Sequence, residues 1–255
     1  VVFQADAAIE ALFAAQNIEI FKIGTVTEGD LVTIKNNADT FTFNVNETRD
    51  TWFKTSYLLD AKQSRNGMAE ARYANYKNQP LDYQFPAHFT GKAAVISSAV
   101  ERPKAAIIRE KGSNSEREMA NAMYLAGFDV KDVHMTDLIS GRETLEDIQF
   151  IGAVGGFSNS DVLGSAKGWA GAFLYNEKAN TALKNFFKRE DTLSVGICNG
   201  CQLWMELELI NPEHKVHGKM HHNTSNKHES IFTSVKVQKN NSVMLSSLEG
   251  ATLGV

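Results

Sequence analysis

Both cysteines of this chain lie in one short stretch, TLSVGICNGCQLWMEL, at residues 192–207. Cys198 and Cys201 are three positions apart, where a strand-like run gives way to a helix-like one. A C-x-x-C pair at a helix N-terminus is typical of thiol-redox proteins, because the helix dipole favours the thiolate of the first cysteine. Two thiols can also supply half of a zinc site. A third interpretation is a single nucleophile with a bystander.

The glycines around Cys198 favour the nucleophile. GICNG, residues 196–200, is the cysteine version of the G-x-S-x-G elbow, in which a sharp strand-to-helix turn exposes the reactive side chain. The backbone of such a residue is strained, and a β-carbon at Gly196 or Gly200 would obstruct the turn. The N–H of Asn199, at the start of the helix, can donate to an oxyanion.

A second oxyanion donor is expected from Gly155-Gly156, which follows another apolar run, FIGAV (150–154). A glycine has no side chain that could block its backbone N–H. Alone, this pair is more typical of an ordinary tight turn. Beside an elbow on the same sheet, the oxyanion role becomes the stronger interpretation, because ligands of such sheets bind beyond the carboxyl ends of the strands.

The spacing along the helix bears on Cys201. In GCQLWMELELI (200–210), Cys201, Trp204 and Met205 share one apolar stripe, so we expect Cys201 to be buried. A redox pair needs two accessible thiols. Thioredoxin-like chains also carry their C-x-x-C near the first strand, whereas here it follows at least three.

Five histidines between His214 and His228, in HKVHGKMHHNTSNKHE, could complete a zinc site. Adjacent histidines such as His221 and His222 usually point in two directions, and no spacing in the run singles out a ligand pair. We expect a polar surface connection there and no metal.

Composition excludes several classes of protein. The formal net charge is −4 and no basic block occurs, so nucleic acid is not an expected partner. No apolar run approaches the roughly 18 residues of a membrane span. The first residues, with Asp6 and Glu10, lack the basic region of a secretory signal. Two cysteines in 255 residues do not make a disulfide framework, so the expected location is cytoplasmic.

Strand-like and helix-like runs alternate after Pro103, which predicts an α/β fold with a parallel sheet covered on both faces. SERE (115–118) reads as a capping box that opens a helix ending at Gly127. The helix after the elbow is expected to reach Leu209. The predicted strands are residues 104–110, 128–135, 150–154 and 192–197, with helices near 168–174 and 181–189.

The first 60 residues or so are typical of an α+β segment. Residues 63–103 are mostly polar and resemble a linker, with a helix at 68–77. The expected elements of the segment before it are a helix at 8–17, strands at 18–24, 31–35 and 40–45, and a helix at 49–65.

Several blocks of the sequence closely resemble one enzyme family. GICNGCQ, GGFSNSDVLGSAKGWA and IIREKGSNSEREMANAMYLAGFDVKDVHMTDL resemble the glutaminase domain of the large phosphoribosylformylglycinamidine (FGAM) synthases of purine synthesis. The match runs from Lys104 to at least Glu229. FKIGTV and RDTWFKTSYLLDAKQSRNG, before it, look like the carboxyl end of the synthetase portion of the same enzymes.

The resemblance implies a domain organisation. Residues 1–62 would be the C-terminal end of a synthetase domain similar to AIR synthase, and 63–103 a linker. Residues 104–255 would be a class I glutaminase domain with a flavodoxin-like, doubly wound parallel sheet, truncated at its C-terminal end.

The resemblance also implies a reaction. Cys198 would attack the side-chain amide of glutamine, release ammonia and leave a glutamyl thioester for water to hydrolyse. A synthetase site elsewhere would use this ammonia, with ATP and Mg²⁺, to convert formylglycinamide ribonucleotide to the amidine; neither cofactor is expected on the present residues. Gly156 and Asn199 would supply the oxyanion N–H groups, and the implied glutamine-binding residues are Phe157, Asp161, Gln202, Asn223 and Ser225.

The family's general base is absent from the sequence given. It is a histidine in a later segment, and neither H-G-E-G nor P-H-P-E-R occurs here. His217 comes too early, so we assign no base and expect the chain to be truncated. Asn159 and Ser160 also depart from the family's usual aromatic and small residues in GGFSxxD. A catalytically incomplete or structural piece, and a thiol-redox or zinc protein, stay as alternatives.

Overall fold

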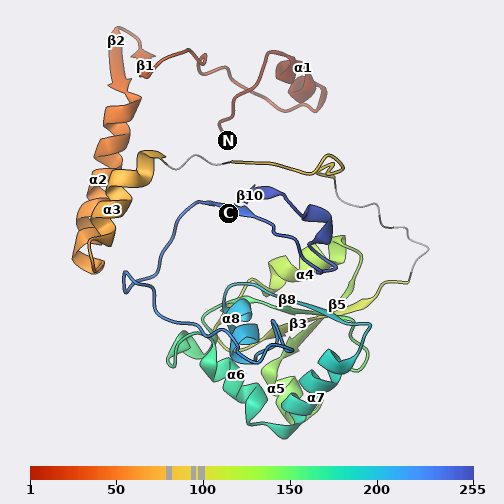
Figure 1. Cartoon of the computed structure of the whole chain (residues 1–255). Coiled ribbons are helices and arrows are strands. Elements are labelled where there is room, and N and C mark those ends of the chain that lie inside the picture. The colour runs from red at the N-terminus through yellow and green to blue at the C-terminus, as the bar shows by residue number, and fades with distance from the viewer. Residues whose placement is uncertain (79–81, 93–95, 97–100) are drawn as a thin grey trace. The chain divides into compact units, whose positions relative to one another are not determined.

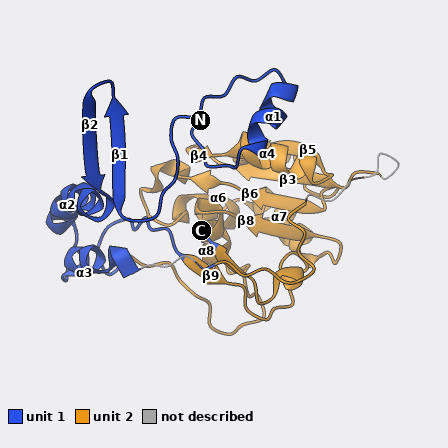
Figure 2. Ribbon diagram, turned by 90° about the horizontal axis from the view of Figure 1, so that it is seen from above, with its two compact units in different colours: residues 1–82, 223–233, 254–255 blue, residues 83–222, 234–253 orange. Residues whose placement is uncertain are grey.

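The computed structural model describes residues 1–255 apart from 79–81, 93–95 and 97–100, so part of the predicted linker lies outside the described residues. The chain divides into two compact units (Figure 2). Unit 1 comprises residues 1–82, 223–233 and 254–255, and unit 2 comprises 83–222 and 234–253.

Unit 2 is built on a parallel sheet of four strands (Figure 1). Their order is β5-β3-β6-β8, which can be followed in Figure 2. In chain order this is 2-1-3-4, because the chain begins on an inner strand, adds a neighbour on one side and then grows on the other. It is the flavodoxin-like order, and the predicted α/β parallel sheet is confirmed. The strands are β3 (Lys104–Arg109), β5 (Asp129–His134), β6 (Phe150–Ala153) and β8 (Leu193–Gly196).

Helices cover both faces of this sheet. Successive side chains of a strand point to opposite faces, so Ala105 and Ile107 join one buried cluster while Ala106 and Ile108 join the other. Helix α4 packs on the first face, and α5, α6, α7 and α8 contribute to the cluster on the second. The bounds are α4 (Glu116–Leu125), α5 (Met135–Ser140), α6 (Lys167–Leu174), α7 (Glu177–Lys188) and α8 (Asn199–Glu206).

Helix α4 begins directly after Ser115, as predicted, but two details of the predicted helix ends were wrong. Ser115 takes a left-handed backbone (φ 73°) and its side chain makes no capping hydrogen bond, so the expected capping box does not form. Helix α8 ends at Glu206 instead of Leu209, and Glu208 just beyond it has φ 61°, which a helix does not tolerate. A capping box does occur at α5. The Asp137 carboxylate accepts from the N–H of His134, and the His134 ring accepts from the N–H of Thr136.

Shorter elements complete the chain. Strands β4 and β7 pair antiparallel, and β9 pairs with β10. Their bounds are β4 (Ser113–Asn114), β7 (Gly155–Gly156), β9 (Ser234–Lys236) and β10 (Thr252–Gly254), with short 3₁₀ helices η2 (Ser158–Asp161) and η3 (Ser246–Leu248).

Unit 1 contains the short helix α1, a two-stranded hairpin and the helices α2 and α3. The Asn44 side chain caps the longer helix by accepting from the N–H groups of Asn46 and Glu47. The predicted strand at 18–24 was wrong: it pairs with no strand in the described part of the chain, and an extended run without a partner forms no ladder. The elements are α1 (Ala8–Ala15), β1 (Leu31–Asn36), β2 (Asp39–Asn44), α2 (Val45–Gln63), α3 (Met68–Asn75) and η1 (Tyr76–Asn78).

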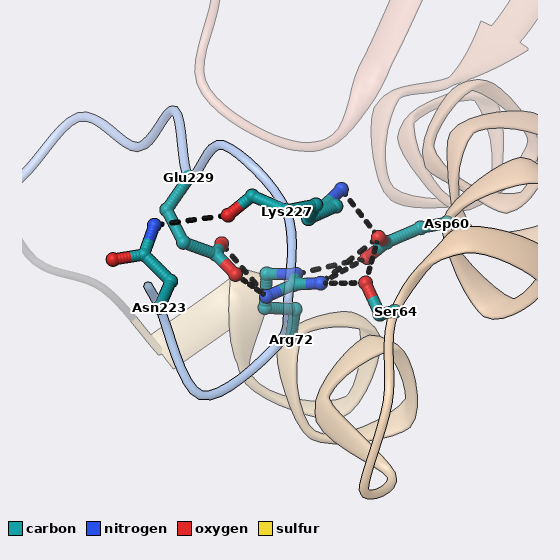
Figure 3. A network of polar contacts seen from close by, with 6 residues as sticks. All are labelled: Asp60, Ser64, Arg72, Asn223, Lys227 and Glu229. Atoms are coloured by element: carbon teal, nitrogen blue, oxygen red, sulfur yellow. Dashed lines mark hydrogen bonds and ion pairs between the residues drawn. The ribbon is translucent and has the colours of Figure 1, made fainter. Parts of the chain in front are cut away.

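Residues 223–233 fold with α2 and α3, through a network of charged groups (Figure 3). Arg72 on α3 donates to Asp60 on α2 at 2.7–2.9 Å and to both carboxylate oxygens of Glu229 at 2.8 Å. Lys227 reaches Asp60 at 2.5 Å, and the N–H of Arg65 donates to the Ser225 carbonyl at 3.1 Å. Side chains and backbone together therefore attach this segment to the helix pair.

The network also sets the charge state of Asp60. Burial raises the pKa of this carboxyl, but the hydrogen bonds from Lys227, Ser64 and Arg72 together outweigh burial and hold the pKa well below its usual range. Asp60 therefore stays ionised as the centre of the network.

Candidate active site

Cys198 joins the end of β8 to the start of α8 in a strained conformation. Its backbone has φ 54° and ψ −110°, a region that L-residues with a β-carbon rarely occupy. The side chain is exposed to solvent. The sharp turn expected from GICNG is therefore present, and it presents the thiol at the carboxyl edge of the sheet.

The flanking glycines are required by close packing. A β-carbon at Gly196 would lie 2.5 Å from Trp204 Cδ1 and 2.6 Å from the Gly200 carbonyl oxygen. One at Gly200 would lie 2.0 Å from the carbonyl oxygen of Ala153 on the neighbouring strand. Both distances are well inside van der Waals contact, so the turn can form only with glycine at these positions.

The Gly-Gly strand β7 lies beside the elbow, as the register of the sheet requires. Ala153 is paired with Gly196, so residues two positions beyond each come close together. A β-carbon at Gly155 would lie 3.3 Å from Cys198 Cβ and 3.9 Å from its Sγ. The sequence-based expectation that these two segments meet at one sheet edge is confirmed.

Gly156 is held by the loop that follows β3. Its φ is 102°, and a β-carbon there would lie 2.7 Å from the Asn114 nitrogen and 2.8 Å from the Gly112 carbonyl oxygen. Gly112 in turn has φ 90°, and a β-carbon on it would lie 2.3 Å from the Phe157 carbonyl oxygen. Sequence reasoning missed this loop, although the glycine in KGSN (111–114) was the signal that could have found it.

The segment after Gly156 has an unusual backbone. Asn159, Ser160 and Asp161 are three consecutive non-glycine residues with positive φ, between 48° and 56°. Such a run is strained and persists only where the surroundings fix it. Backbone hydrogen bonds to the loop after β3 hold part of the segment, from Phe157 N–H to the Gly112 carbonyl (2.9 Å) and from Asn159 N–H to the Lys111 carbonyl (2.7 Å).

The side chain of Asn199 makes further hydrogen bonds to this segment. It is fully buried, and its Oδ1 accepts from the N–H of Ser158 at 3.1 Å. Its Nδ2 donates to both carboxylate oxygens of Asp161 (3.3 and 3.2 Å) and to Oε1 of Gln202 (2.9 Å). Sequence reasoning named Asn199 for its backbone alone and missed this side chain.

The predicted glutamine-binding residues fall into two groups. Phe157, Asp161 and Gln202 belong to the elbow region of unit 2, with Phe157 exposed and the other two partly buried. Asn223 and Ser225 belong to unit 1, where Asn223 Nδ2 donates to the Lys227 carbonyl and Ser225 is buried. A contact of these five residues with glutamine stays a prediction.

Cys201 is exposed, so the prediction that it is buried was wrong. The inward face of α8 carries Gly200, Leu203 and Trp204, and Cys201 lies about a quarter-turn away from it. Both thiols are free and accessible, so burial no longer argues against a redox pair. The case for a single nucleophile rests on the strain and the glycines, which single out Cys198.

The described residues contain no group of three or more histidine, cysteine, aspartate or glutamate side chains that could hold a metal ion. His217 lies 3.7 Å from Glu208, and these two line a small hollow with Met205 and Val216. Among the helices that the structure describes, none has the length and apolar character needed to cross a bilayer.

Comparison with known proteins agrees with this geometry. The model of the CobB/CobQ-like glutamine amidotransferase domain matches residues 102–255, so the chain belongs to this family. The match covers the sheet, the elbow and the Gly-Gly strand.

Two relatives are more specific. The chain is 38% identical over 268 residues to "Probable phosphoribosylformylglycinamidine synthase, chloroplastic/mitochondrial" of Arabidopsis thaliana, covering 98% of this chain and 18% of the relative. It is 39% identical over 226 residues to the phosphoribosylformylglycinamidine synthase of Homo sapiens, covering 83% of this chain and 17% of that relative. The predicted resemblance is confirmed, and the chain spans less than a fifth of each relative's length.

A solved structure, titled "Structure of PurLQS from Thermotoga maritima", matches 61% of this chain and 66% of its own. The sequence identity is 23% and the TM-score 0.43.

Proposed function

We propose that this chain is the amidotransferase-bearing part of a phosphoribosylformylglycinamidine synthase, with Cys198 as the nucleophile that hydrolyses glutamine. The observation that carries the proposal is the strained Cys198 elbow beside the Gly155-Gly156 strand. Membership of the amidotransferase family and the names of both relatives support it.

The chemistry follows from the elbow. The Cys198 sulfur attacks the side-chain amide carbon of glutamine, and the carbonyl electron pair moves onto oxygen. The backbone N–H groups of Gly156 and Asn199 stabilise this oxyanion. Collapse breaks the C–N bond, the proton from the thiol leaves with the nitrogen as ammonia, and a glutamyl thioester remains. Water hydrolyses the thioester to glutamate and restores the thiol. We assign no residue of this chain as general base.

Recognition of glutamine is proposed for Phe157, Asp161 and Gln202 in unit 2, and for Asn223 and Ser225 in unit 1. Asp161 and Gln202 adjoin the elbow through the Asn199 side chain, which supports their assignment. Phe157 directly follows the Gly155-Gly156 strand beside the elbow. The assignment of Asn223 and Ser225 rests on the resemblance alone.

The remaining steps belong to the longer protein. We propose that the ammonia reaches a synthetase site outside residues 1–255, where ATP and Mg²⁺ activate formylglycinamide ribonucleotide for amidination. Within this chain, residues 1–62 would end the synthetase domain, 63–103 would form the linker, and 104–255 would form the glutaminase domain. The cytoplasm is the proposed location, because two free thiols suit a reducing compartment.

The test uses the whole polypeptide that carries this chain and measures amidine formation from two nitrogen sources. Cys198→Ala should abolish the reaction with glutamine and leave the reaction with ammonium salts, because only the glutaminase step needs the thiol. Cys201→Ala is the matched control and should support both. Two results would contradict the proposal. One is an unsubstituted protein that forms no amidine from ammonium salts, and the other is full use of glutamine by Cys198→Ala.

A thiol-redox pair is the second candidate, because both thiols are exposed, free and three residues apart at a helix N-terminus. It predicts that oxidation joins Cys198 to Cys201 reversibly, and that either alanine variant abolishes the activity. The amidotransferase proposal predicts different behaviour for the two variants.

A further inference from the structure

The loop from Gly156 to Asp161 needs an external restraint. Three consecutive left-handed residues without glycine are each strained, so the loop relaxes unless its surroundings fix it. The loop after β3 fixes its first half, through Phe157 and Asn159. The N–H of Ser158 and the carboxylate of Asp161 are fixed from the other side, by one buried amide.

That amide belongs to the residue directly after the proposed nucleophile. Asn199 is fully buried and lies in the first turn of α8, so it moves with the elbow. Its Oδ1 accepts from the loop at Ser158, and its Nδ2 donates to the loop and to Gln202 on its own helix. Asp161 also accepts from the N–H of Ala166 at 3.1 Å, which orients the carboxylate toward Asn199.

We propose that the side chain of Asn199 is a positioning group that sets the Gly156–Asp161 loop against the Cys198 elbow. Through it, the two backbone N–H groups assigned to the oxyanion are held at a fixed separation, since one belongs to Asn199 and the other begins the loop. The proposal deepens the proposed function and rests on it for the identity of the reaction. It gives the side chain a role in rate that is separate from glutamine affinity.

The hydrogen-bond donor and acceptor can be exchanged between the side chains of Asn199 and Asp161. Asn199→Asp replaces the donor by a second carboxylate facing Asp161, and two carboxylates this close repel. Adding Asp161→Asn returns a donor to the pair from the opposite side, while oxygen atoms still face the N–H groups of Ser158 and Ala166. Gln202 can turn its amide to donate to the new carboxylate. Asn176→Asp is the matched control, because Asn176 caps α7 and aspartate caps equally well.

The first measurement is the labelling of Cys198 by the glutamine analogue diazo-norleucine, resolved into a maximal rate and a half-saturating concentration. Asn199→Asp should lower the maximal rate by about 10- to 100-fold, with little change in half-saturation, because misplacement of about 1 Å has effects of this size. Labelling by iodoacetamide, which needs no oxyanion site, should stay unchanged. The exchanged double variant should recover the maximal rate to within a few-fold, while its half-saturating concentration rises, because Asp161 is also assigned to glutamine recognition.

The second measurement is amide hydrogen exchange of residues 156–162, which needs no activity. Exchange at Ser158 should accelerate in Asn199→Asp, return to the original rate in the double variant, and stay unchanged in Asn176→Asp. If Asn199→Asp does not fold, Asn199→Ser replaces it, since it removes both amide donors without adding charge, and the same losses are expected.

Two results overturn the positioning role. One is a double variant whose maximal labelling rate and Ser158 hydrogen exchange are no closer to the original than those of Asn199→Asp. The other is a loss of iodoacetamide labelling in Asn199→Asp as large as its loss of labelling by diazo-norleucine. Failure of the unsubstituted chain to react with the glutamine analogue would count against the proposed function instead, and the exchange measurement would still decide on Asn199.

Discussion

At the scale of single residues, the elbow is a balance between backbone strain and packing. Cys198 adopts an unfavourable conformation that only the surrounding structure maintains. The buried Trp204 side chain occupies the position that a β-carbon at Gly196 would need, and the Ala153 carbonyl occupies the position that a β-carbon at Gly200 would need. The Cys198 thiol is thus exposed by residues to which no chemical role is assigned.

This account predicts a specific sensitivity at Gly200. Gly200→Ala should lower the free energy of unfolding by about 1–3 kcal/mol and abolish labelling of Cys198 by a glutamine analogue, because its β-carbon overlaps the Ala153 carbonyl. Urea unfolding and intact-mass spectrometry measure the two effects. Gly171→Ala in α6 is the control: its β-carbon lies no closer than 3.7 Å to Tyr175, so labelling should persist and stability should rise slightly. Normal labelling of Gly200→Ala would contradict the account.

The elbow and its glycines could be predicted from five residues, because their spacing encodes a steric requirement. The exposure of Cys201 could not. The apolar stripe of a helix is broad, and residue types alone do not show which member lies at its edge. The Asn199 side chain was missed because its partners, Ser158 and Asp161, lie about forty positions away in the sequence.

At the scale of elements, the sheet was predictable because β3 buries both of its faces. Ala105 to Ile108 form an uninterrupted buried run, which is typical of a parallel strand between two layers of helices. The short helix α5 was missed, since six residues give little periodicity. The capping box at Ser115 was wrongly predicted because a motif does not reveal the backbone conformation of its first residue.

The second feature at this scale is the attachment of residues 223–229 to α2 and α3, in which Arg72 joins Asp60 to Glu229. Arg72→Ala should lower the free energy of local opening of this segment by about 1–3 kcal/mol, because Asp60 and Glu229 both lose a charged donor. Hydrogen exchange of residues 223–229 measures the change. Lys104→Ala removes an exposed ion pair with Asp147 and should change stability by less than about 1 kcal/mol.

The same network predicts a dependence on pH. The pKa of Asp60 is lower in the folded chain than in the unfolded one, so its stabilisation is complete above the unfolded value of about 4. It is lost as the pH falls below that value toward the folded pKa. The protection of residues 223–229 against exchange, corrected for the slower intrinsic exchange at low pH, should therefore fall selectively below about pH 4 in the original chain, and less so in Arg72→Ala. Equal pH dependence in both would contradict the role given to Asp60.

At the scale of the whole molecule, the family match and the folded units have different boundaries. The match covers residues 102–255, yet residues 223–233 fold with helices that precede it. The contacts responsible join residues 157 positions apart, such as Arg72 and Glu229, and leave no local pattern in the sequence. Sequence reasoning could therefore propose a glutaminase domain but not that part of it folds with α2 and α3.

The central claim is that Cys198, and not Cys201, is the nucleophile toward glutamine. The most direct test incubates the chain with diazo-norleucine and locates the adduct by intact-mass and peptide mass spectrometry. We predict one adduct on Cys198, lost in Cys198→Ser and retained in Cys201→Ser. An adduct on Cys201, or none while Cys198 still reacts with iodoacetamide, would contradict the account.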